Sequence, residues 1–354
     1  MLVINDTHCG VNRSGGTTPT TFAMLTEYVQ EKFEGLLDIG SSDGCVLLNG
    51  DCFDGFLVSN AVLLRTYSAI CARLESGAIK TFFLARGNHD IARDTTKLSS
   101  FDLLGALLTD AYPQQVVVIN EPTLVAWSEH ELDQGWVVPH APNQDIFDLW
   151  IADVGRQPAP FVFVHANYSN GFAAEADHSL NVTVEQCAML EAVGFKHLVF
   201  GHEHQQGIRP NGVIIVGNQI CTSISDCLGN TYKRAIQIDE GQISEVVTWQ
   251  DRGSYFECEW SKLDQIPETA QFVRIKGEAD DDQAAAVIEA ISALRKKHSA
   301  FVISNAVVVN GRALDVSAIE AVEQVQQFDV TEFLFDNLTK AQADYLRPML
   351  KERA

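Results

Sequence analysis

Five apolar segments of the chain each run into a short cluster of polar side chains. The segments are LVIN, CVLLNG, KTFFLARG, PFVFVH and KHLVFGH, and each is short enough to be a strand. The polar clusters are Asp6 with His8, Asp51 with Asp54, Asn88 with His89 and Asp90, His165, and His202 with His204. In layered α/β proteins, functional residues gather in loops at the carboxyl ends of strands. This arrangement predicts an α/β fold with a polar site at one edge of a buried sheet.

The residue types in these clusters match a site for two divalent metal ions. Carboxylate, imidazole and amide oxygen together suit divalent cations of intermediate hardness. A bridging carboxylate keeps two such ions about 3.5 to 4 Å apart, where they clamp phosphoryl oxygens and lower the pKa of a bound water. Each cluster alone has an ordinary explanation, since a lone Gly-Asp is usually a turn and a lone histidine a structural residue. The order and spacing of all five favour the metal site.

The segments between these clusters complete a layered α/β pattern. Helices are predicted at 21–37, 59–75, 99–109 and 183–193, and further strands at 114–120, 135–140 and 212–217. After about residue 250 a smaller unit follows, with strands at 271–277 and 301–309 around a helix at 280–297. Two spacings typical of helix starts, Asp329 with Glu332 and Thr339 with Gln342, predict two short helices in the tail.

The five motifs, DxH, GDxxD, GNHD, a strand-terminal His and GHxH, occur in that order. On these motifs, the chain resembles the calcineurin-like metallophosphoesterase superfamily over residues 1 to about 250. The resemblance implies an α/β/β/α sandwich. It divides the chain into a metallophosphoesterase nuclease domain (1–250), a small βαβ capping domain (251–310) and a helical partner-binding tail (311–354).

The same resemblance implies a role for each motif residue. One metal is expected on Asp6, His8, Asp51 and His204, and the other on Asp51, Asn88, His165 and His202. Asp51 is the implied bridge, and a metal-bound hydroxide is the implied nucleophile. His89 is expected to stabilise the pentacoordinate phosphate or to protonate the leaving oxygen, with Asp90 orienting its ring.

The stretches outside the metal motifs indicate a branch of the superfamily. The segment GVIIVGNQICTSISDCLGNTYKRAIQIDEGQISEVV, the capping domain and the tail resemble an SbcD-type DNA repair nuclease subunit of bacteria or phages. This resemblance implies an exonuclease and endonuclease of DNA repair and recombination. It implies two divalent metal ions, with Mn²⁺ expected and Mg²⁺, Fe²⁺ or Zn²⁺ as alternatives. DNA, an SMC-like SbcC-type ATPase bound through the C-terminal helices, and a second copy in a homodimer are the implied partners.

Two other functions stay open at this point. The first is a stand-alone metallophosphatase or nucleotide phosphodiesterase acting on a small substrate, and the second is a noncatalytic scaffold that kept the fold. Arg13 and Arg86 are candidates for substrate binding because they lie on loops next to the motifs, and His140 is a candidate because it also ends a predicted strand. Surface solubility for the two arginines, and a structural loop position for His140, are the alternatives. The tail, likewise, docks either on a partner or on the protein's own body.

Composition and charge limit the class of protein and its expected cellular location. The net charge of −22, from 25 Lys and Arg against 47 Asp and Glu, argues against sequence-independent adhesion to nucleic acid. The chain has no apolar run of about 18 residues and no signal-peptide pattern, so we expect a cytoplasmic protein without a membrane segment. The eight cysteines form no CxxC pair and are expected to be free thiols packed as small hydrophobic residues.

Overall fold

The computed structural model describes residues 1–11, 16–40, 43–92, 97–170, 180–228 and 232–310, and the backbone of residues 312 and 313. Arg13 and the two helices expected in the tail lie outside these residues.

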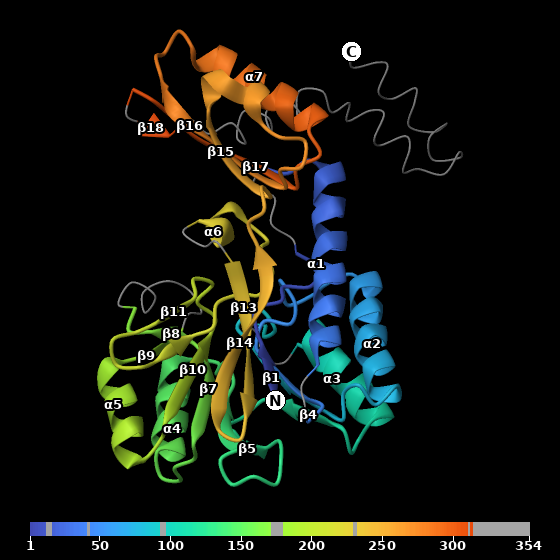
Figure 1. Ribbon diagram of the computed structural model, residues 1–354, viewed down its shortest axis with the longest axis vertical. Coiled ribbons are helices and arrows are strands. Elements are labelled where there is room, and N and C mark those ends of the chain that lie inside the picture. The colour runs from blue at the N-terminus through green and yellow to red at the C-terminus, as the bar shows by residue number, and fades with distance from the viewer. Residues whose placement is uncertain are drawn as a thin grey trace, which may run out of the picture.

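Two mixed sheets form the centre of the larger unit, in the lower part of Figure 1. The first sheet contains, from edge to edge, β14 (Gln242–Gln250), β13 (Tyr232–Asp239), β1 (Leu2–Ile4), β2 (Cys45–Asn49), β3 (Thr81–Ala85) and β4 (Val116–Ile119). The second contains β11 (Gly207–Ile208), β12 (Ile214–Ile215), β10 (His197–Gly201), β7 (Phe161–His165), β6 (Gln134–Val138) and β5 (Thr123–Ala126). Strands β1 to β4 are parallel, as are β6, β7, β10 and β12. A short pair, β8 (Asn167–Tyr168) with β9 (Asn181–Val182), lies beside the second sheet.

Helices cover the outer face of each sheet (Figure 1). The first sheet is covered by α1 (Pro19–Ile39), α2 (Asn60–Glu75) and α3 (Ser100–Ala111), and the second by α4 (Gln144–Val154) and α5 (Val184–Val193). Each of these helices begins after a side-chain cap, provided by Thr18, Ser59, Ser99, Asn143 and Thr183. Such caps satisfy backbone N–H groups that the first turn leaves unpaired.

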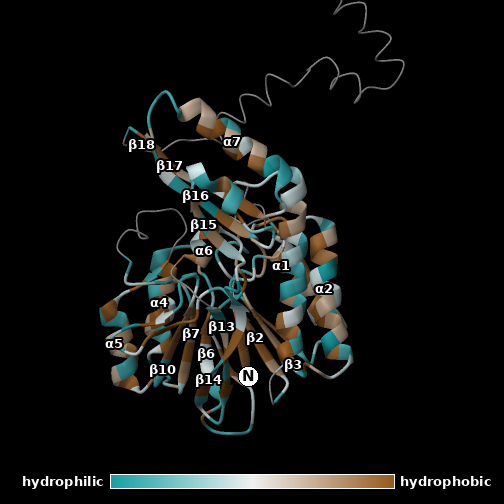
Figure 2. Ribbon diagram, turned by 45° about the horizontal axis from the view of Figure 1, so that its top comes forward, coloured by the Kyte–Doolittle hydropathy of each residue, from teal (hydrophilic) through white to brown (hydrophobic). Residues whose placement is uncertain are grey.

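The central strands are apolar on both faces, which explains why they read as continuous hydrophobic runs (Figure 2). In β1, Leu2 and Ile4 belong to the core under α1 to α3, whereas Val3 belongs to the core between the sheets. A third core lies between the second sheet and helices α4 and α5. The protein is therefore a layered α/β/β/α sandwich, which confirms the fold class expected from the sequence.

A smaller unit, β15 to β18 with α7, follows the sandwich, and we name it the capping unit after the expectation from the sequence. Its sheet has the order β15 (Tyr255–Glu259), β16 (Phe272–Ala279), β17 (Val302–Val309) and β18 (Arg312–Ala313). A short 3₁₀ helix (Trp260–Gln265) follows β15, and α7 (Ala284–Lys297) links the parallel strands β16 and β17, which confirms the predicted βαβ pattern. Its aromatic side chains join the sandwich core, since the Tyr28 ring of α1 lies 4.9 Å from Phe301 and 6.4 Å from Phe272 between centroids.

Most predicted elements are present within a few residues of their expected positions. Among the elements that were not predicted are α4, β5, β15 and α6 (Ile224–Cys227), and the strand expected at 212–217 is the two-residue β12. Among the described helices, none combines the length and apolar character needed to cross a bilayer.

Candidate metal centre

The polar motifs meet because they end neighbouring parallel strands. The loops after β1, β2 and β3 lie side by side at one edge of the first sheet, and those after β7 and β10 come from the second. Backbone hydrogen bonds join the first two loops, since Asp6 N–H donates to the Gly50 carbonyl at 3.1 Å and His8 N–H to the Asp51 carbonyl at 3.1 Å. The sheet edge thus fixes the spacing of the motifs before any side chain is considered.

Four of the motif residues have a left-handed backbone. Asp6, His8, Asp51 and His202 have φ values of 51°, 47°, 50° and 79°. Such values are uncommon for residues other than glycine, and strained backbone of this kind clusters at functional sites where the surrounding structure enforces it. These backbone conformations direct the four side chains towards one centre.

Two motif glycines are required because the centre leaves no room for a Cβ atom. A Cβ on Gly50, which has φ +89°, would lie 2.0 Å from Nδ1 of His165. A Cβ on Gly87 would lie 2.1 Å from Oδ1 of Asp51. The Gly-Asp and Gly-Asn steps are therefore packing requirements of the site as well as turns.

Asp6, His8 and His204 form one group of candidate ligands. They offer ligand atoms that all lie within 4.8 Å of one another. Nδ1 of His204 lies 2.7 Å from Asp226 Oδ1, and Nδ1 of His8 lies 3.2 Å from Asp54 Oδ1. The two Nε2 atoms consequently face each other, 3.1 Å apart. Two ring nitrogens directed at one another in this way are a suitable pair of ligands for a cation.

Asp51, His165 and His202 form the second group, again with ligand atoms within 4.8 Å. Nδ1 of His165 donates to the Asn49 carbonyl at 2.9 Å, so Nε2 faces the centre. That Nε2 lies 3.4 Å from Asp51 Oδ2 and 3.1 Å from Oδ1 of Asn88. These two oxygens and the ring nitrogen converge on one position, which suits a positive charge.

The charge distribution shows the same preference for cations. Burial opposes a charged His165 ring, yet the Asp51 and Asp6 carboxylates raise the pKa of His165 to about 9. Burial also opposes ionisation of Asp51, but His165, His89 and His8 hold its pKa well below the ordinary value. Burial and the neighbouring His165 lower the pKa of His202 to about 4, which keeps this ring available as a neutral ligand. The donor set therefore fits divalent metal ions.

Asp51 lies between the two groups. Its Oδ2 is 3.4 Å from His165 and 4.0 Å from Nε2 of His8, and it also groups with His8 and His89. A carboxylate in this position can reach cations on either side.

His89 is held by the loop after Asp51. Its backbone N–H donates to Asp51 Oδ1 at 2.9 Å, and its ring Nδ1 lies 2.8 Å from the Asp54 carbonyl. Since a carbonyl oxygen can only accept, Nδ1 carries the proton and Nε2 remains for other chemistry.

Asp90 makes hydrogen bonds other than the one expected with the His89 ring. Its carboxylate accepts backbone N–H groups of Gly87, Cys52 and Phe53 at 2.9 to 3.2 Å, and it makes no hydrogen bond to His89. Burial and the Asp51 charge raise the pKa of Asp90 to about 7. Asp90 ties the loops after β2 and β3 together, whereas the Asp54 carbonyl orients His89.

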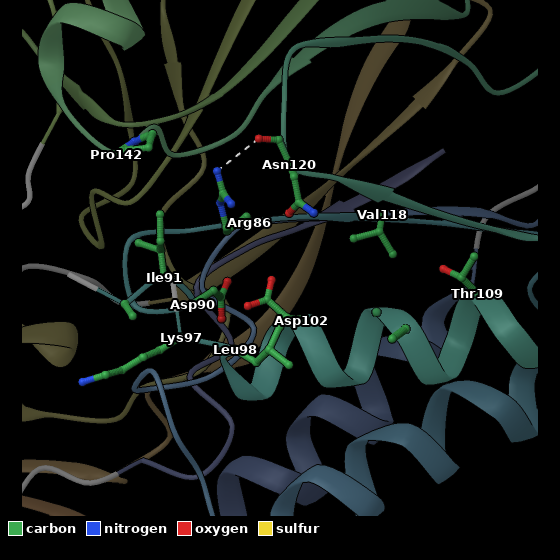
Figure 3. Close-up of a pocket in the computed structure, with 13 residues that line it drawn as sticks. Arg86, Asp90, Ile91, Lys97, Leu98, Asp102, Thr109, Val118, Asn120 and Pro142 are labelled. Carbon is green, nitrogen blue, oxygen red and sulfur yellow. Dashed lines mark hydrogen bonds between the residues drawn. The ribbon is translucent and has the colours of Figure 1, made fainter. Parts of the chain in front are cut away.

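Two of the candidates for substrate binding lie beside this centre. Arg86 Nη2 donates to the carbonyls of Asn120 and His140, at 3.1 and 3.3 Å. His140 is buried, and burial together with the neighbouring His165 lowers its pKa to about 3. Arg86 also lines a pocket of about 600 Å³ between α3 and the end of β4 (Figure 3). Asp90 lines this pocket as well, but none of the candidate metal ligands does.

Neither Asp226 nor the contacts of Asp54 were predicted from the sequence. Both carboxylates face the Nδ1 atom of a candidate ligand, His204 and His8 respectively. A weak signal for Asp226 existed, because Ser223 three residues earlier gives the spacing of a helix cap, and Ser223 does cap α6. That signal predicts a helix start and contains no information on His204.

Comparison with known proteins agrees with this geometry. A family model described as calcineurin-like phosphoesterase matches residues 1–206, more than half of the 354 residues. The matched region contains all seven candidate ligands and His89. A search of curated proteins finds no match to the chain.

Proposed function

Because this chain belongs to the calcineurin-like phosphoesterase family, we propose that its metal-dependent phosphoester hydrolysis acts on DNA phosphodiesters. The observation that supports hydrolysis is the convergence of carboxylate, imidazole and amide ligands in two groups, with Asp51 close to His165 of one group and His8 of the other. In this proposal the protein is the exonuclease and endonuclease subunit of an SbcCD-like repair and recombination complex.

Each ligand group is assigned one divalent cation, with Mn²⁺ as the expected metal. Asp6, His8, Asp51 and His204 would hold one ion, and a second would bind to Asp51, Asn88, His165 and His202. Two divalent cations at this centre supply positive charge to phosphoryl oxygens and lower the pKa of water.

His89 is assigned the proton transfer to the leaving oxygen. Its Nδ1–H is committed to the Asp54 carbonyl, so a proton can be given or taken only at Nε2. The Asp51 carboxylate accepts a hydrogen bond from the His89 backbone N–H, and this contact fixes the backbone of His89 relative to the ligands. Such a positioned acid contributes about 10²- to 10⁴-fold to a rate.

The capping unit adds a polar face beside the sandwich. Val273 and Ile275 of β16 pack in the core with α7, while Phe272 packs in the core of the sandwich. By strand alternation, Arg274 and Lys276 lie on the same side as Phe272, where both pair with Glu257 at 3.2 and 2.6 Å. A polar face with cationic groups beside the sandwich suits a phosphodiester backbone.

The acidic composition favours a second source of DNA affinity. With a net charge of −22, the chain repels a polyanion except where metal ions or local cations screen it. An SMC-like ATPase bound to residues 328–354, and a second copy of the chain, are proposed to supply the remaining contacts. Removing these residues should leave the sandwich folded and abolish copurification with the ATPase.

A hydrolysis assay tests the substrate. The purified chain with Mn²⁺ is given labelled linear duplex DNA, single-stranded DNA and an aryl phosphate monoester, with Asp51→Asn as the control. DNA cleavage that the control lacks supports the proposal. Monoester hydrolysis without DNA cleavage, with and without the ATPase, would instead identify a stand-alone phosphatase.

A further inference from the structure

Asp226 lies beyond the region matched by the family model, yet it contacts a candidate metal ligand. It is the third residue of α6 and is fully buried. Its Oδ1 lies 2.7 Å from Nδ1 of His204. The position of this carboxylate therefore decides which nitrogen of His204 carries the proton.

The other carboxylate oxygen is held by four donors from its own loop. Oδ2 accepts Thr222 N–H at 2.8 Å, Thr222 Oγ1–H at 2.9 Å, Ser223 N–H at 2.8 Å and Ser223 Oγ–H at 2.9 Å. Four donors leave this oxygen no freedom to rotate away. The second oxygen is consequently directed at His204 in a fixed orientation.

The main chain of His204 is fixed separately. The fully buried Lys233 donates from Nζ to the His204 carbonyl at 3.0 Å. With the backbone held in this way, the contact with Asp226 governs the rotation and the tautomer of the ring. The side chain then presents Nε2, with its lone pair, 3.1 Å from Nε2 of His8.

We propose that Asp226 is a positioning residue that makes His204 a metal ligand by holding the proton on Nδ1. Carboxylates paired with metal-binding histidines commonly act in this way. This inference rests on the proposed ligand groups and concerns the ion on Asp6, His8 and His204. Because α6 packs against β16, the support for this ion extends to the capping unit.

The substitution Asp226→Asn separates positioning from structural support. The backbone N–H groups of Thr222 and Ser223 can only donate, so the amide oxygen must stay on their side. The amide NH₂ then faces Nδ1 of His204 and forces that nitrogen to accept. The His204 proton moves to Nε2, which can no longer bind a cation.

Titration of the metal-free full chain with Mn²⁺, by calorimetry and by electron paramagnetic resonance, measures the affinities of the two ions separately. We expect Asp226→Asn to lower the affinity for one ion about 10- to 100-fold and to leave the affinity for the other unchanged. Melting of the metal-free variant should stay within about 5 °C of wild type. His204→Ala should weaken the same ion, and adding Asp226→Asn to it should cause no further loss.

Thr222→Val is the matched control, because it removes one donor to Oδ2 and leaves the His204 contact in place. It should leave both ions unchanged. Equal weakening of both ions in Asp226→Asn, or the same loss in Thr222→Val, would show a structural role and overturn the inference. A wild-type chain that fails to bind two ions would contradict the proposed function itself, whereas wild-type affinity in Asp226→Asn would contradict only the role of Asp226.

Discussion

The Nε2 atoms of His8 and His204, which are 196 positions apart in the chain, lie 3.1 Å from each other. One histidine follows the first strand of the first sheet and the other follows β10 of the second sheet. The candidate metal centre therefore lies where the two sheets meet. A change that separates the sheets should reduce metal binding before it unfolds either of them.

Asp51→Asn should abolish turnover and weaken both metal ions. The substituted amide lacks the charge with which Asp51 serves both ligand groups, so we expect activity to fall more than about 100-fold. Mn²⁺ titration together with the hydrolysis assay measures the effect. Turnover close to that of the wild type would disprove the assignment of Asp51 as the bridge.

His89→Ala should keep both metal ions and lose about 10²- to 10⁴-fold in rate. The reason is that Nε2 of His89 is assigned to the substrate, while its Nδ1 is committed to Asp54. The two Mn²⁺ affinities and the single-turnover rate are measured on the same preparation. Because His89 also groups with His8 and Asp51, loss of an ion in this variant would show that His89 is itself a metal ligand.

Asp90→Ala should destabilise the fold. It leaves the buried N–H groups of Gly87, Cys52 and Phe53 without their acceptor, which we expect to cost about 3 kcal/mol of unfolding free energy. Urea denaturation measures this cost. Asp153→Ala, at an exposed pair with Arg156, is the control and should change stability by less than about 0.5 kcal/mol. An unchanged free energy of unfolding in Asp90→Ala would refute the role as a loop clamp.

Gly50→Ala should disrupt the second ligand group. The added methyl would lie 2.0 Å from Nδ1 of His165, and the residue has a φ of +89°. We expect at least about 1 to 3 kcal/mol of destabilisation and loss of the ion on His165. Gly55→Ala is the matched control, since a Cβ there meets nothing within 4 Å. Equal metal binding by the two variants would contradict the close packing of Gly50 on His165.

The thiols should react slowly in the native protein. All eight cysteines are buried free thiols, and burial raises the pKa of Cys9 and of Cys187 to about 12. Since the thiolate is the reactive form, a colorimetric thiol reagent should titrate about eight groups only after denaturation. Several fast-reacting groups in the folded protein would show that the cores around these residues open readily.

Much of the fold could be predicted from local sequence patterns. The strands beneath the site are apolar on both faces because each lies between two cores, so they appear as uninterrupted runs such as CVLLN. The short strand β5 and helix α4 were not predicted. In β5, Thr123 and Leu124 are not buried, and a four-residue strand gives a weak periodic signal.

The sequence by itself determined the kinds of metal-binding side chains and their places at strand ends, because strand periodicity and motif order are local properties of the chain. The tertiary structure decided which atoms face the centre. The carbonyls of Asn49 and Asp54 and the carboxylate of Asp226 set the exposed nitrogens of His165, His89 and His204. The tertiary structure also decided the contacts of Asp90, because it accepts hydrogen bonds from Cys52 and Phe53, which are distant in the sequence. A proton on an imidazole goes where an acceptor lies, and folding alone places that acceptor.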